Sequence, residues 1–119
     1  MTTAHAVAFA LPLLPGRTDD ERAALASCWT GPSREAHRDA RRRAGITREA
    51  VWLQRTDGGD LVVVHLEADD LEQAASALGT SPDPFDQWFR EHVLHVHGVS
   101  IADGLPAPEQ LLQFDVDDV

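Results

Sequence analysis

The sequence predicts an α+β domain in which helices cover one face of an antiparallel sheet. Three observations lead to this fold class. Apolar and small residues alternate over residues 5–11, which predicts a first strand, and a Thr-Asp-Gly-Gly turn at residues 56–59 separates two apolar runs, which predicts a β-hairpin. The third observation is that a helical pattern follows the first strand and another follows the hairpin. With 119 residues the chain is long enough for one core, so we expect a single domain over residues 1–119.

Composition and charge exclude several classes of protein. The chain is 43% hydrophobic and 25% charged, which is typical of a globular domain. Its net charge of −10 argues against nucleic acid as a partner. The apolar start is too short to cross a bilayer, so we expect no membrane partner. Cys28 is the single cysteine, which excludes an internal disulfide and a cysteine-based metal cage and favours the cytoplasm.

Two helical segments are expected between the first strand and the hairpin. Thr18 and Glu21 have the spacing of a capping box, so we expect a helix to begin there and to be interrupted at Gly31-Pro32. The second segment runs to Gly45 and is rich in arginine. We interpret its charges as a solvated face, and an anion-facing patch is the alternative.

The hairpin turn fixes which residues of its two strands lie opposite one another. The expected pairs are Gln54 with Leu61, Trp52 with Val63 and Ala50 with His65. Strand alternation then gives one uniformly apolar face, which should lie under the helices: Val51, Leu53, Val62, Val64 and Leu66. The other face carries Trp52, Gln54, Leu61, Val63 and His65, and its mixed chemistry favours ligand binding.

The last third of the chain predicts a further helix and a last strand. Asp83 and Pro84 are suited to begin a helix that ends at Gly98. Its apolar stripe includes His92, so that histidine should be buried, while His95 and His97 occupy the final turn. Residues 111–116 alternate as a strand. The resulting order of elements is a split β-α-β, ferredoxin-like arrangement with a four-stranded sheet. A homodimer would cover its open face.

This arrangement resembles the dimeric alpha-beta barrel superfamily, which includes the antibiotic biosynthesis monooxygenases. Two segments, RRRAGITREAVWLQRTDGGDLVVVHLEADD and DPFDQWFREHVLHVHG, are similar to a group of small actinobacterial proteins of this fold. The resemblance implies the fold and carries over no catalytic residue. Proteins of the wider superfamily often work without a cofactor on aromatic or polyketide-like molecules, so the resemblance implies no cofactor and a hydrophobic or aromatic small molecule as partner.

His65 is the candidate catalytic residue, because an imidazole beside Trp52 and Gln54 could act as an acid or base. The candidate substrate-binding residues are Trp52, Gln54, Val63, Trp88, Phe89 and His92. We expect no metal site, since His97 should point away from His92 and His95 and no cysteine supports them. Two hypotheses follow: a small cofactor-independent enzyme of secondary metabolism, monooxygenase- or cyclase-like, or a non-catalytic dimeric small-molecule-binding or accessory protein.

Overall fold

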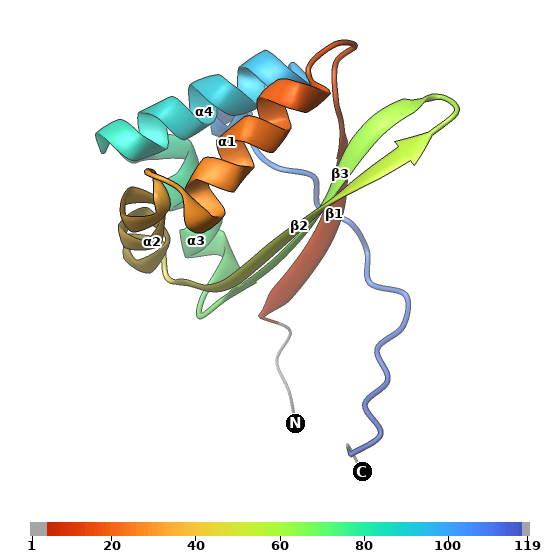
Figure 1. The fold of residues 1–119 in the computed structure, drawn as a ribbon. Helices are drawn as coiled ribbons and strands as arrows, with labels where there is room; N and C mark the ends of the chain where they lie inside the picture. Colours follow the sequence, from red (N-terminus) through yellow and green to blue (C-terminus); the bar gives the residue numbers. More distant parts are fainter. Residues whose placement is uncertain (1–4, 118–119) are drawn as a thin grey trace.

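The computed structural model describes residues 5–117 and has a mixed α+β architecture (Figure 1). Its elements follow in the order β1 (Ala6–Pro12), α1 (Thr18–Thr30), α2 (Arg34–Arg43), β2 (Ile46–Thr56), β3 (Gly59–Ala68), α3 (Leu71–Thr80), α4 (Pro84–His97) and a short 3₁₀ helix, η1 (Ile101–Asp103). The strands form one antiparallel sheet in the order β1-β3-β2. Figure 1 shows the four α-helices gathered on one side of this sheet.

The predicted hairpin register is confirmed. Ala50 pairs with His65, Trp52 with Val63 and Gln54 with Leu61. Because paired residues of an antiparallel sheet point to the same side, the predicted apolar face is also confirmed: it packs under the helices. On β1, Phe9 and Leu11 continue this buried face, while the small alanines point the other way.

The boundaries of α4 agree with the prediction. The Asp83 side chain accepts a hydrogen bond from the backbone N–H of Phe85, and Pro84 occupies the first turn. Gly98 ends the helix in the left-handed conformation with φ of 71°. These three positions set where the histidines near the end of α4 lie relative to α1.

The predicted last strand is wrong for the single chain. Residues 104–115 have no regular structure and form a C-terminal tail that runs down the side of the sheet opposite the helices (Figure 1). Leu111, Leu112, Phe114 and Val116 are 80–88% exposed. The residues alternate as a strand should, but within residues 5–117 they pair with no strand. The sheet therefore has three strands where four were expected.

The predicted capping box at the start of α1 is also wrong. The Thr18 hydroxyl donates to the Asp60 carboxylate at 2.6 Å, and no side chain caps the helix. Glu21 is turned away from the helix end and buried against α4. A tertiary interaction has replaced the local one.

Candidate functional site

The sheet divides the predicted site residues into two groups. His65, Trp52, Gln54 and Val63 share the face that no helix covers, as expected from the hairpin register. Trp88, Phe89 and His92 lie on α4, in the helix layer on the other side. The structure therefore offers two places for chemistry, one on each face of the sheet.

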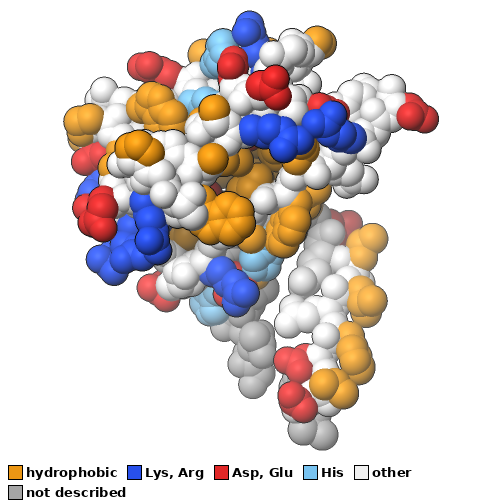
Figure 2. Space-filling view, viewed as in Figure 1, with side chains coloured by type: hydrophobic (Ala, Val, Ile, Leu, Met, Phe, Trp, Pro, Cys, Tyr) orange, Lys and Arg blue, Asp and Glu red, His pale blue; other side chains and the backbone are white. Residues whose placement is uncertain are grey.

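On the open face, His65 forms a pair with a carboxylate. Its Nε2 lies 2.8 Å from Oε2 of Glu67, and both side chains are partly exposed. The ring borders a groove of about 300 Å³ between β1 and the C-terminal tail, lined by Ala6, Val7, Ala8, His65, Pro108, Glu109 and Gln110. Figure 2 shows the tail standing off the body of the molecule, with hydrophobic side chains along it. Trp52 lies on β2 two positions after Ala50, the residue paired with His65, and is 57% exposed.

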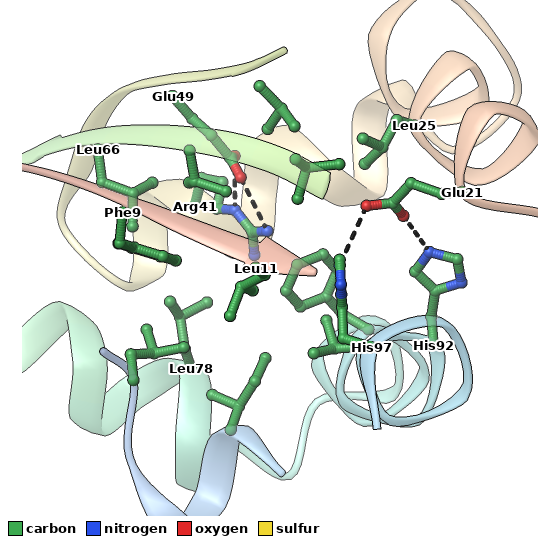
Figure 3. Close-up of a pocket in the computed structure, with 17 residues that line it drawn as sticks. Phe9, Leu11, Glu21, Leu25, Arg41, Glu49, Leu66, Leu78, His92 and His97 are labelled. Carbon is green, nitrogen blue, oxygen red and sulfur yellow. Dashed lines mark hydrogen bonds and ion pairs between the residues drawn. The ribbon is translucent and has the colours of Figure 1, made fainter. Parts of the chain in front are cut away.

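In the helix layer, the carboxylate of Glu21 on α1 contacts the rings of two histidines on α4 (Figure 3). His92 Nε2 lies 2.7 Å from Oε1, and His97 Nε2 lies 3.3 Å from Oε2. His97 Nδ1 also lies 2.8 Å from the backbone carbonyl of Pro12. His97 therefore bridges the carboxylate of Glu21 and the carbonyl of Pro12, with one ring nitrogen facing each acceptor.

A second buried pair joins α2 to β2. Arg41 donates from Nε to Oε1 of Glu49 at 2.9 Å and from Nη2 to Oε2 at 3.4 Å. His37 Nε2 lies 2.8 Å from the same carboxylate, and the Arg41 guanidinium stacks over the Phe89 ring at 4.4 Å. The Arg41 side chain is only 6% exposed.

Both buried carboxyls are held ionised. Burial raises the pKa of Glu21, but the hydrogen bonds and charges of His92 and His97 outweigh it and lower the pKa to about 2. Burial likewise raises the pKa of Glu49, and the charge of Arg41 together with the hydrogen bonds from His37 and Arg41 lowers it to about 2. The interior of this domain therefore keeps two negative charges and their partners at neutral pH.

A small cavity separates these two pairs. It has a volume of about 60 Å³, and both Glu21 and Arg41 border it along with apolar side chains from the sheet and the helices (Figure 3). A cavity of this size admits a few atoms, whereas the groove beside His65 reaches the lower limit of ordinary ligand pockets, about 300 Å³. The interior cavity can therefore hold only a very small molecule, whereas the groove beside His65 can hold a larger ligand.

The structure corrects the expected directions of two histidines. His97, expected to point away from His92, converges with it on Glu21, while His95 points outward to Asp20. The rings of His92 and His97 both extend from α4 toward α1, where the carboxylate lies between them (Figure 3). Within residues 5–117 no group of three or more His, Cys, Asp or Glu residues is arranged to hold a metal ion.

The sequence interpretation missed Arg41, Glu49 and Glu21. Signals for the first two were present: Arg41 follows His37 by four residues and lies next to Ala40 on the buried side of α2, and the hairpin register puts Glu49 on the apolar face. The face of α2 expected to be solvated therefore contains one buried arginine. Nothing local marks Glu21, because its partners lie some seventy residues away.

Comparison with protein-family models, with curated proteins and with solved structures finds no match for this chain. In the part of the chain that the structure describes, no helix has the length and apolar character to cross a membrane.

Proposed function

We propose that this chain is a homodimeric, cofactor-independent enzyme that acts on a small aromatic or polyketide-like molecule, with His65 as its acid or base. The observation that carries the proposal is the His65–Glu67 pair beside a groove large enough for a ligand. A carboxylate bound to one ring nitrogen orients the imidazole and leaves Nδ1 available to a substrate. The apolar groove wall and the exposed Trp52 suit an aromatic molecule.

The exposed apolar surface supports the homodimer. The open face presents Trp52 and the alanines of β1, and the tail adds four large exposed hydrophobic side chains. Monomers rarely leave a large contiguous apolar surface in water, so a second copy that covers this surface would be favoured. The tail would then become the fourth strand, because β1 is an edge of the sheet and needs a partner. This completes a ferredoxin-like sheet and a dimeric barrel around His65.

His65→Ala should abolish turnover and change the free energy of unfolding by no more than roughly 0.5 kcal/mol, because the side chain is partly exposed. The assay would follow a panel of hydroxylated polycyclic aromatic compounds by mass spectrometry, with ligand binding measured by thermal shift. Arg55→Ala, at an exposed position of β2 that is absent from the groove wall, is the matched control and should retain activity.

The same assay separates the two functions. If the chain is an enzyme, the unmodified chain converts a compound that it binds, and the His65→Ala variant does not. A non-catalytic binding protein would bind a compound, convert none of the panel and show only weaker binding after His65→Ala. Turnover that survives His65→Ala would remove this histidine from the mechanism.

A further inference from the structure

Arg41 has a donor that no other group satisfies. Among the buried side-chain nitrogen and oxygen atoms of the described residues, its Nη1 is the one without a hydrogen-bond partner. Nε and Nη2 are both directed to Glu49. A buried donor without a partner is costly, and such groups usually mark a bound water, ion or ligand.

The unpaired nitrogen points into the small cavity between the sheet and the helices. Figure 3 shows Nη1 directed away from Glu49, on the side of the guanidinium where Leu11 lies. The cavity of about 60 Å³ has room for roughly four to six atoms the size of a water oxygen. Most of its wall is apolar, with Leu66, Leu78 and Ile101 among the lining residues.

The charges around the cavity indicate what kind of molecule fits. Arg41 is paired with Glu49, and the carboxylate of Glu21 lies between the rings of His92 and His97, at 2.7 Å and 3.3 Å. A bound anion would add a negative charge without a partner to an interior that already holds two carboxylates. A neutral molecule with an acceptor oxygen would satisfy Nη1 without that cost.

Water can fill only part of the site. A water beside Nη1 could accept from it and donate to a carboxylate oxygen of Glu21 or Glu49. Further waters would face mainly the apolar side chains of the wall. A molecule with one acceptor oxygen and an apolar body matches a wall with one free donor and apolar side chains.

We infer that this cavity is a binding site for a small uncharged carbonyl compound, a ketone or an aldehyde, whose oxygen accepts from Nη1 of Arg41 and whose carbon chain packs against Leu78 and Ile101. The site lies on the helix side of the sheet, opposite the groove beside His65, so neither proposal depends on the other.

Three probes of nearly equal size test the inference on the full chain: butanone, 2-methylbut-1-ene and propionate. The alkene replaces the carbonyl oxygen with a methylene group, and propionate adds a charge. Binding would be followed by NMR through the Arg41 Nε–H and the methyl groups of Leu78 and Ile101. We expect saturable binding of butanone and at least about tenfold weaker binding of the other two, because a hydrogen bond to a charged donor is lost or a charge is buried.

Arg41→Lys removes Nη1 and keeps a positive charge beside Glu49, so butanone should bind at least about tenfold more weakly. Arg42→Lys, on the exposed neighbour, is the matched control and should bind as the unmodified chain does. No saturable binding of butanone would mean that the cavity holds water only and would overturn the inference. Equal binding of the alkene, or tighter binding of propionate, would overturn it as well. If Arg41→Lys does not fold, the comparison of the three probes decides.

Discussion

Glu49→Leu should destabilise the domain by about 3–5 kcal/mol, since it leaves the buried guanidinium of Arg41 without its carboxylate. The Arg41 side chain is 6% exposed and that of Glu49 is 17% exposed, so water can replace little of the lost interaction. Removing one partner of a buried pair costs far more than the pair itself contributes. Urea unfolding followed by circular dichroism gives the change in free energy.

Two controls separate the buried charge from other effects of Glu49→Leu. The double variant Glu49→Leu with Arg41→Met removes both charges and should recover most of the loss. His95→Ala removes the pair with Asp20, whose two side chains are 48% and 54% exposed, and should cost less than about 1 kcal/mol. A loss in Glu49→Leu no larger than that in His95→Ala would show that the Arg41–Glu49 pair is not buried as described.

Acid should unfold the domain through Glu21 and Glu49. Their pKa is about 2 in the folded chain against an ordinary value of 4.5. A carboxyl whose pKa is lowered by folding stabilises the folded state above its unfolded pKa. This stability is lost as the pH falls from about 4.5 toward about 2, and each carboxyl accounts for roughly 3 kcal/mol. Urea unfolding at a series of pH values between neutral and strongly acidic measures the loss.

Glutamine variants test the assignment of this pH dependence. Glu21→Gln and Glu49→Gln should each be less stable at neutral pH and lose less stability on acidification than the unmodified chain. Glu91→Gln, at an exposed position of α4, should leave the pH dependence unchanged. If the acid sensitivity were the same in all three variants, the two buried carboxylates would not be its source.

The local parts of the fold could be predicted from the sequence. Two-residue alternation and the glycine turn were sufficient for the register that pairs Ala50 with His65, and the Asp83-Pro84 pair marked the start of α4. These features depend on neighbours in the chain. The face that His65 and Trp52 share was therefore predictable, although the carboxylate of Glu67 that orients His65 was not recognised.

The interior site could not be predicted, because its partners are distant in the sequence. Glu21 and His92 are separated by 71 positions, and the charge pattern of α1 equally suits a solvated helix end. The expected strand at 111–116 failed for a related reason. Its alternation describes a segment able to pair, but whether a strand forms depends on an edge being within reach. In the single chain these residues remain exposed.

The state of association tests the proposed function most directly, since in the proposed dimer the second copy would cover the groove beside His65. Sedimentation equilibrium at micromolar concentration should give twice the chain mass of 13.0 kDa. Replacing Leu112, Phe114 and Val116 together with serine should give a monomer, whereas Asp115→Asn, between two of these positions, should remain a dimer. A monomer for the unmodified chain, or a dimer that the triple replacement leaves intact, would contradict the account.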